Sequence, residues 1–379
     1  MRFPVPHYAL DVVEKAEAFV QSGRFTDLDR RCVHQRFLEL AKAGGETSEE
    51  MLQHIHDRQL NHFGATAATD EDFKRQREAF EQKVWPVIRP LLQRNPGTAQ
   101  FMLEHGVDSQ FVAQFLYDVQ KNQGVSILLG HGIGHTVTDE LVEVPPTDNA
   151  FAFYHDASFG IFRFRAKLAQ AELERTDPDP DDPGEPKRIL FLGGGADPTL
   201  YARRMRLDKY AQRIVVYDND PQMRYYLHKI MGSLSDAGID YRIGDINDVL
   251  QDESQFGQYD LICLLGVAAY YADRPQFLFD GVYNLLKPGG RVIFDVQSMH
   301  PVLAFDVYVL GWPTTMHVEP SIEAAIQVSQ LDCEKAGLSV LWTRVEDVVE
   351  SVEIPAGVVT LAEKPHESAL GEPENIEDL

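Results

Sequence analysis

The sequence predicts an α/β protein: a doubly wound, mostly parallel sheet with a terminal antiparallel hairpin, preceded by a mainly helical N-terminal domain. From residue 187 onward, short apolar runs alternate with helical stretches, which is the pattern of βαβ units. Before about residue 120, apolar residues follow helical spacing instead. An acidic, proline-rich segment at residues 176–186 separates the two patterns.

Composition and charge narrow the classes of function. The chain has 379 residues, of which 44% are hydrophobic and 25% charged, enough for the cores of two domains. Its 59 acidic and 35 basic residues give a formal net charge of −24, which repels a phosphate backbone and disfavours a nucleic-acid partner. Cys32, Cys263 and Cys333 lie far apart without a C-x-x-C spacing, so we interpret them as thiols in a reducing cytoplasm.

The N-terminal region is predicted to be helical by the spacing of its apolar residues. Between residues 12 and 20, apolar residues recur at i, i+1, i+4, i+7 and i+8, and between 111 and 119 they recur at i, i+1, i+4, i+5 and i+8, so each set forms one stripe. Thr47 followed by Glu50 predicts a capping box at the start of a further helix. The first residues lack the basic and apolar regions of a signal peptide, and no apolar stretch reaches ~18 residues. We therefore expect a cytoplasmic protein without a membrane partner.

The domain boundary is predicted at the acidic segment from Thr176 to Pro186. Its alternate prolines remove backbone donors and its like charges repel, so it forms neither helix nor strand. Residues 1–175 are then the helical domain, with loops at 124–156, and residues 187–365 are the sheet domain. The last residues, 366–379, form an acidic tail.

The sheet domain shows a repeated order of strand, turn and helix. Short runs of Ile, Val, Leu and Phe predict parallel strands that are covered on both faces, and two later runs predict the terminal hairpin. The five parallel runs lie at 188–195, 213–220, 241–246, 259–266 and 289–296, and the hairpin runs at 338–345 and 357–364.

The ends of the predicted strands carry the candidate binding residues. Ligands of open α/β sheets bind beyond the carboxyl ends of the strands, where glycine lets a ligand approach the backbone and an acid can accept hydrogen bonds from ribose. Asp218 follows Gly195 by 23 positions, a spacing that suits this arrangement. The candidates are Gly193, Gly194, Gly195, Asp197, Asp218, Asn219, Asp245, Ile246, Leu265 and Gly266.

With these strand ends, residues 187–365 resemble the class I S-adenosylmethionine-dependent methyltransferases. The family's glycine turn corresponds to Gly193 through Gly195, its ribose acid to Asp218, and its acid near adenine to Asp245 with Ile246. The segment NLLKPGGRVIFD, which precedes and enters the fifth strand, is also typical of the family. The resemblance implies a Rossmann-like fold, S-adenosylmethionine as the cofactor and transfer of a methyl group.

The sequence also departs from the family pattern. Phe191 stands where the family has an acid in the first strand, and Asp197 stands where it has a third glycine. The fourth strand is not followed by an N-P-P-Y motif, which argues against adenine-N6 and glutamine methylation. The turns G-G-G-A-D-P and D-N-D-P are faintly similar to those of nicotianamine-synthase-like enzymes. Transfer or cyclisation of the aminocarboxypropyl arm, with release of methylthioadenosine, is therefore an alternative, and a non-catalytic scaffold is a third.

A dinucleotide cofactor is a further alternative, because NAD-binding folds share the opening of strand, glycine turn and helix. Their pyrophosphate lies at a helix N-terminus, where free amides and the helix dipole favour an anion. Asp197 at that position would place a carboxylate near the phosphates. S-adenosylmethionine carries a sulfonium and no phosphate, so the acid is tolerable or useful beside it.

Candidate catalytic residues are Tyr154, His155 and Tyr270. Tyr154 and His155 precede a helix that in such folds often lies over the cofactor, and His155 could accept a proton. Tyr270 follows the fourth strand, where family members place residues near the transferred group. Each of the three could instead have only a surface or packing role. His300 and His317 flank the connection after the fifth strand and are weaker candidates.

We predict no metal site. The motif GHGIGH, at residues 130–135, spaces two histidines at i, i+4, but ligation from that spacing needs a helix, which three glycines disfavour. The favoured function is methylation of a small molecule, with the N-terminal domain covering the substrate crevice and excluding water. The sequence does not predict the substrate or the oligomeric state.

Overall fold

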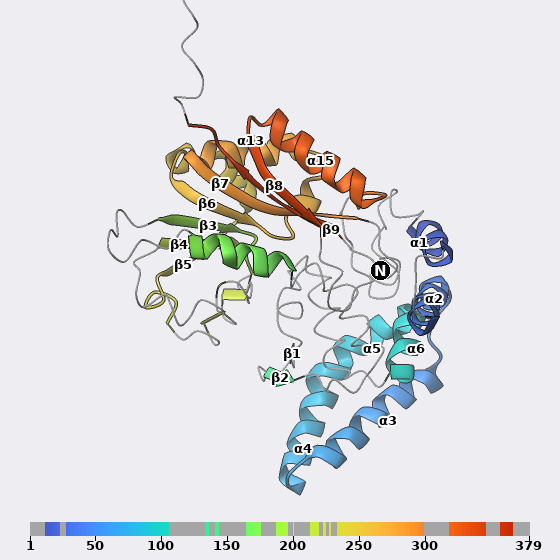
Figure 1. Ribbon diagram of the computed structural model, residues 1–379. Coiled ribbons are helices and arrows are strands. Elements are labelled where there is room, and N and C mark those ends of the chain that lie inside the picture. Colours follow the sequence, from blue (N-terminus) through green and yellow to red (C-terminus); the bar gives the residue numbers. More distant parts are fainter. Residues whose placement is uncertain are drawn as a thin grey trace, which may run out of the picture. The chain divides into compact units, whose positions relative to one another are not determined.

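The computed structural model describes two units (Figure 1). The helical unit comprises Met1–Phe162, Met299–Thr315 and Asp347–Ala356, and the sheet unit comprises Arg163–Ser298, Met316–Glu346 and Gly357–Leu379. The structure describes residues 12–22, 28–105, 133–135, 141–143, 164–175, 187–195, 200, 213–219, 223–224, 227–228, 233–298, 318–345 and 357–366.

The described part of the helical unit consists of helices and one two-stranded sheet. In that sheet, β1 (Ile133–His135) pairs antiparallel with β2 (Leu141–Glu143). His135, the second histidine of GHGIGH, therefore lies in a strand and not in a helix, which the three glycines of the motif disfavour. The helices are α1 (Val12–Gln21), α2 (Leu28–Lys42), α3 (Glu49–Thr66), α4 (Asp70–Ala79), the π-helix η2 (Phe80–Val84), α5 (Trp85–Arg94) and α6 (Pro96–His105).

The start of α3 corrects the predicted capping box. Ser48, not Thr47, is the N-cap, and its side chain accepts from the backbone N–H of Met51. Thr47 is buried, and its hydroxyl donates to the carbonyl of Leu92 in α5, 2.5 Å away. A contact with a distant helix therefore takes the hydroxyl that the local pattern assigned to the cap, and Glu50 falls outside the box position.

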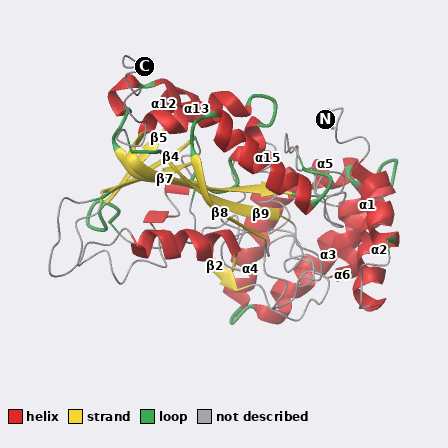
Figure 2. Cartoon of the chain, turned by 45° about the horizontal axis from the view of Figure 1, so that its top comes forward, coloured by secondary structure: helices red, strands yellow, loops and turns green. Residues whose placement is uncertain are grey.

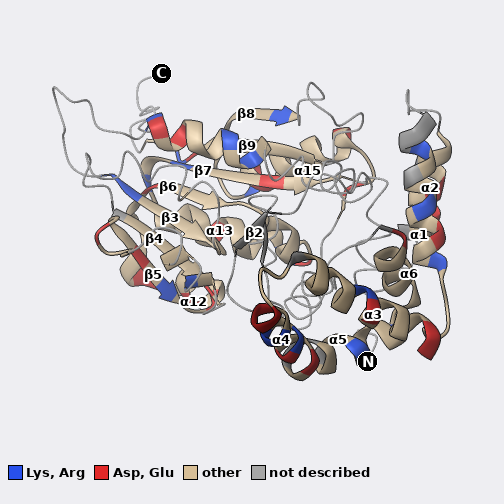
Figure 3. Ribbon diagram, turned by 90° about the horizontal axis from the view of Figure 1, so that it is seen from below, with Lys and Arg blue, Asp and Glu red and all other residues tan. Residues whose placement is uncertain are grey.

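Packing of the helical unit differs along its length. A buried apolar cluster joins α3, η2, α5 and α6, with Phe80 and Leu92 fully buried. In contrast, α4 buries no residue, and acidic and basic residues follow one another along its ribbon (Figure 3). Arg77 pairs with Glu81 at 3.0 Å, one turn along the helix. Such exposed pairs contribute less than about 1 kcal/mol each, so the cluster stabilises this unit.

Among the described residues of the sheet unit, seven strands form one sheet in the order β5-β4-β3-β6-β7-β9-β8 (Figure 2). The five strands from β5 to β7 are parallel, and β9 is antiparallel to both β7 and β8. The strands are β3 (Arg188–Leu192), β4 (Arg213–Asp218), β5 (Ile239–Ile243), β6 (Tyr259–Leu264), β7 (Leu286–Gln297), β8 (Ser339–Val345) and β9 (Gly357–Glu363).

This topology confirms the predicted fold class. The predicted parallel runs and the terminal hairpin form the strands of the sheet, and β9 inserts between β7 and β8. Strands at the centre are buried on both faces, since the successive residues Ile189 and Leu190 of β3, which point to opposite faces, are both fully covered, as are Leu261 and Ile262 of β6. The connecting helices are α12 (Ile246–Gln251), α13 (Pro275–Leu285) and α15 (Ile322–Lys335), with the 3₁₀ turns η4 (Glu253–Gln255) and η5 (Ala268–Tyr271).

A helix over residues 164–175, drawn green in Figure 1, is grouped with the sheet unit. Its residues Leu168, Ala169 and Leu173 are buried. The division by contacts therefore begins the sheet unit at Arg163, before the boundary predicted at 176–186. The predicted linker and the acidic tail from residue 367 onward lie outside the described residues.

Within the described residues, none of the helices combines the length and apolar character that crossing a membrane would require.

Candidate functional site

The turn after β3 brings glycines against two other strand ends. Gly193 has φ +62°, a conformation that side chains rarely adopt, and its N–H donates to the carbonyl of Tyr217 in β4 at 2.8 Å. A Cβ atom added to Gly193 would lie 2.7 Å from Cγ2 of Val267, which follows β6, and 3.3 Å from Cδ1 of Ile246, which follows β5. The segments after β3, β5 and β6 are therefore in contact.

Asp218 ends β4 and faces the same turn. Its carboxylate Oδ2 accepts from the backbone N–H of Gly195 at 2.8 Å, and its side chain is buried at 6% exposure. The carbonyl of Asp218 accepts from the N–H of Gly244, which follows β5. Asn219, the next residue, is exposed. An acid predicted from its spacing thus lies against the glycine turn.

Asp245 begins α12 as its N-cap. Its Oδ1 accepts from the backbone N–H and from the side-chain amide of Asn247, both at 2.8 Å. The carbonyl oxygen of that amide accepts from the hydroxyl of Tyr271, in η5 after β6, at 3.2 Å. A chain of hydrogen bonds therefore joins the segment after β5 to the segment after β6. Ile246, also predicted, is half-buried beside Gly193.

The two tyrosines after β6 differ in burial: Tyr271 belongs to the core and Tyr270 lies at the surface. Tyr271 is buried, and burial, followed by the nearby charge of Asp245, raises the pKa of its hydroxyl. Its ring stacks on Phe277, and the guanidinium of Arg274 lies 5.0 Å from the ring centroid. Tyr270, the predicted catalytic residue, is 44% exposed, which is the accessibility that contact with a substrate would need.

Leu265 and Gly266 form the turn after β6. The N–H of Gly266 donates to Oδ1 of Asp295 in β7 at 2.5 Å. Oδ2 of the same carboxylate accepts from Nη1 of Arg165, in the helix at 164–175, at 3.1 Å. Leu265, Arg165 and Asp295 are all buried. A buried ion pair therefore lies directly behind a predicted binding turn.

Arg165 and Asp295 are residues that the sequence reasoning missed. Asp295 stands in the phrase NLLKPGGRVIFD, which was recognised only as typical of the family. Arg165 lies 130 positions away, so nothing local links the two. The available signal was an acid inside an otherwise apolar strand, because a buried acid requires a partner.

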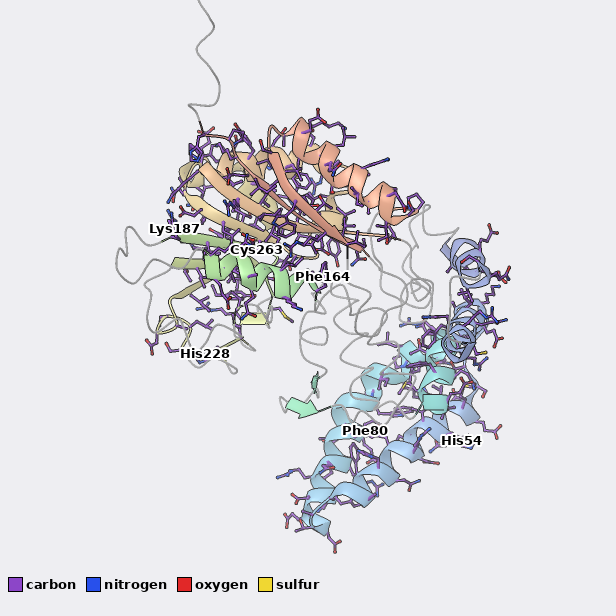
Figure 4. All side chains as sticks on the ribbon, in the orientation of Figure 1. His54, Phe80, Phe164, Lys187, His228 and Cys263 are labelled. Carbon is purple, nitrogen blue, oxygen red and sulfur yellow. The ribbon has the colours of Figure 1, made fainter. Side chains whose placement is uncertain are left out.

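The structure brings most of the predicted binding residues to one edge of the sheet. The strands β3 to β6 are parallel, so the segments after their carboxyl ends share an edge, and the contacts above join them. Figure 4 labels Cys263, near the end of β6, and Lys187, before the start of β3. Asp197, Tyr154 and His155 lie outside the described residues, as do His300 and His317.

The described residues of this edge offer carboxylate oxygens and apolar surface to a ligand. Asp218 and Asp245 offer carboxylate oxygens to hydroxyl and amino donors. Ile243, at the end of β5, is 50% exposed and offers apolar surface to a base. Among the described residues, no group of three or more His, Cys, Asp or Glu side chains could hold a metal ion.

The sheet unit matches one known family over part of the chain. Residues 192–294, from the end of β3 into β7, match the family model described as a methyltransferase domain. Over these residues, the sheet unit is therefore similar to a methyltransferase domain. The matched residues include the glycine turn, Asp218, Asp245 and Gly266. No curated protein matches the chain significantly.

Several solved structures are weakly similar to parts of this chain. A possible exported protein from Bordetella parapertussis is 15% identical, with a TM-score of 0.44 over 83% of this chain and 96% of that one. Geranyl diphosphate C-methyltransferase from Streptomyces coelicolor is 12% identical, with a TM-score of 0.41 over 66% and 97%. A SAM-dependent methyltransferase from Methanosarcina mazei is 11% identical, with a TM-score of 0.36 over 48% and 95%. At these values, the likenesses carry no argument about the substrate.

Proposed function

We propose that this chain binds S-adenosylmethionine at the carboxyl edge of the sheet and methylates a small molecule. The observation that supports the proposal best is the mutual contact of four strand-end segments, after β3, β4, β5 and β6, each carrying a predicted binding residue. A ligand that lies across this edge of an open α/β sheet can contact all four.

Each segment has a part that follows from its chemistry. Asp218 is proposed to accept from the ribose hydroxyls, and Asp245 with Ile246 to line the adenine. The backbone of Gly193 through Gly195, with Asp197, is proposed to hold the aminocarboxypropyl arm. Leu265 and Gly266 are proposed to line the remaining side of the cofactor site. The two acids also suit a cationic cofactor, because opposite charges attract at short range.

When bound, S-adenosylmethionine supplies an electrophilic methyl group on a sulfonium. The protein's task is then to hold a nucleophile in line with the carbon–sulfur bond, at roughly 3–3.5 Å from the carbon, and to keep water away. A base of the protein would receive any proton that the nucleophile loses on accepting the methyl group. His155 is proposed as that base, with Tyr154 and Tyr270 orienting the substrate.

The helical unit is proposed to cover the substrate crevice. A charge of −24 favours neutral or cationic small molecules over nucleic acid as substrates. Transfer of the aminocarboxypropyl arm, the alternative raised by the glycine turn, gains no support from the matched family model.

Two measurements test the proposal. Isothermal titration should show micromolar binding of S-adenosylhomocysteine by the full chain and no comparable binding of NAD. Mass spectrometry of reactions that contain S-adenosylmethionine and candidate small molecules should then detect S-adenosylhomocysteine. Methylthioadenosine above the level without enzyme would instead mean that the arm is transferred. Binding of neither cofactor would leave the scaffold alternative.

A further inference from the structure

Two acid–base contacts, each with a buried acid, join the helix at 164–175 to strand β7. Near the start of the helix, Arg165 pairs with Asp295 at 3.1 Å. Near its end, Glu172 lies 3.7 Å from Arg291 and 2.9 Å from Arg175. Arg165, Asp295 and Glu172 are 7%, 2% and 3% exposed, so both contacts tie the helix to the strand with little solvent around the acids.

The two contacts lie at different levels of the strand, with Arg291 in the middle of β7 and Asp295 near its carboxyl end. Seven helical positions separate Arg165 from Glu172, about 10 Å, and four strand positions separate Arg291 from Asp295, about 13 Å. The early helix residue meets the late strand residue, so the helix runs antiparallel to β7. Only the Arg165–Asp295 pair therefore lies at the carboxyl edge, where the binding turns are.

The Arg165–Asp295 pair is built around the backbone of Gly266. One oxygen of Asp295 accepts from the Gly266 N–H and the other from Arg165, so the carboxylate bridges turn and helix. Gly266 has φ +75°, and a Cβ added to it would lie 2.8 Å from Nη1 and 3.0 Å from Nη2 of Arg165. The guanidinium therefore packs on the glycine itself, and any side chain at this position would displace it.

We propose that Arg165 and Asp295 are positioning residues: the pair fixes the conformation of the Leu265–Gly266 turn and thereby sets the affinity for the cofactor. This inference rests on the proposed function, in which Leu265 and Gly266 line the cofactor site. A buried carboxylate between two donors holds both in one geometry, because each bond is charge-assisted and shielded from water. Neither residue needs to touch the cofactor, since they act through the backbone of the turn.

The test compares Asp295→Asn with Glu172→Gln in the full chain. Both variants neutralise a buried carboxylate that ties the same helix to the same strand, so their melting temperatures should fall by similar amounts. Asn keeps an oxygen for the Gly266 N–H but loses the charge that holds Arg165. We expect Asp295→Asn to raise the Kd of S-adenosylhomocysteine roughly tenfold or more, because small displacements in a binding site are costly, and Glu172→Gln to change it less than twofold. Equal effects of the two variants on Kd would overturn the proposal.

Hydrogen exchange of the ligand-free protein gives a second readout that needs no cofactor. The amide of Gly266 should exchange at least about tenfold faster in Asp295→Asn and unchanged in Glu172→Gln, because only the first loosens this turn. Unchanged exchange in Asp295→Asn would contradict the proposal even if the wild-type protein bound no S-adenosylhomocysteine, a result that would by itself refute only the proposed function. Faster exchange with an unchanged Kd would show that the turn does not set the affinity.

A double variant shows whether Arg165 and Asp295 act together or independently on the affinity for the cofactor. If Arg165 and Asp295 act together, Arg165→Met combined with Asp295→Asn should raise Kd no more than Asp295→Asn alone, whereas independent residues would multiply their effects. Should Asp295→Asn fail to fold, Arg165→Lys replaces it in the same comparison. This change keeps the positive charge but loses the planar fork that packs on Gly266.

Discussion

The two ends of the sheet hold acids in different surroundings. At the amino end, Asp260 in β6 accepts from the Lys287 ammonium and from the backbone N–H of Arg188, both at 2.8 Å, with Lys187 at 3.6 Å. At the carboxyl end, Asp218 accepts from the backbone N–H of Gly195, and Asp245 accepts from the backbone and side-chain amides of Asn247. Lysines thus contact the acid at the amino end, whereas amide groups of the turns contact these two acids at the carboxyl end.

The glycines at the two ends of β6 differ in the same way. Gly257, before the strand, has φ +63° with open space where a Cβ would lie. Gly266, after the strand, has φ +75° and carries the guanidinium of Arg165. The turn conformation alone requires a glycine at position 257. At position 266, glycine is required both by the turn conformation and by the guanidinium that packs against it. Under the proposed function, ligand binding belongs to the carboxyl end, where Gly266 has a packing requirement that Gly257 lacks.

Alanine at Gly266 should give the largest effect. A left-handed conformation costs a side chain about 1–2 kcal/mol, and crowding in a packed interior adds about 1–3 kcal/mol. Gly266→Ala should therefore lower the free energy of unfolding by about 2–5 kcal/mol in urea titrations. Gly257→Ala is the matched control and should cost only about 1–2 kcal/mol. Equal losses would mean that the Arg165 contact adds nothing.

Asparagine at Asp218 should weaken cofactor binding. The amide keeps one oxygen for Gly195 but replaces the other with a donor, which cannot accept from a ribose hydroxyl. Hydrogen bonds to charged groups contribute about 1.5–3 kcal/mol, so Kd for S-adenosylhomocysteine should rise by roughly 10–100-fold in isothermal titration. An unchanged Kd would remove Asp218 from the binding site.

Phenylalanine at Tyr271 should have a smaller effect. The variant loses the hydrogen bond to Asn247 but keeps the ring, so unfolding should become easier by about 0.5–1.5 kcal/mol. Because burial raises the pKa of this hydroxyl in the folded state, the unfolded chain loses the proton first, from an ordinary value of 10.0. The wild type should therefore lose stability as the pH rises above about 10, and Tyr271→Phe should lose less. Parallel pH profiles would contradict this.

Asparagine at Asp260 should give the smallest effect. This variant makes the Asp218 substitution at the other end of the sheet, where the partners are partly exposed lysines. Such ion pairs contribute about 0.2–1 kcal/mol, so the free energy of unfolding should fall by that amount, and Kd for S-adenosylhomocysteine should stay the same. A tenfold rise in Kd would break the proposed division between the two ends.

The sequence predicted the strands and the binding turns because both depend on local patterns. Apolar runs such as Ile189 to Leu192 can be buried on both faces only in a central strand, and the sheet places them there. Asp218 and Asp245 were found because each directly follows such a run or the turn after it. These positions need no knowledge of the rest of the chain.

What the sequence missed depends on contacts between distant residues. Thr47 was assigned to a helix cap, but α5 provides the carbonyl that takes its hydroxyl, and no local pattern reports where α5 will lie. Arg165 and Asp295 were missed for the same reason. The boundary at Arg163 also differs from the predicted one, because proline and charge mark where helix cannot continue but not which unit the preceding helix joins.

The order of charges on the helix at 164–175 affects the direction in which the helix docks on β7 during folding. Reading along the contact, the helix presents a cation and then an anion, and β7 presents the complementary order in reverse. A helix docked end for end would bring Arg165 to the partly exposed Arg291 and Glu172 to Asp295, two acids that are both buried. Buried like charges are far more costly than a missing contact. The charges of these four side chains therefore determine the direction in which the helix packs on the sheet, which its apolar pattern alone would not determine.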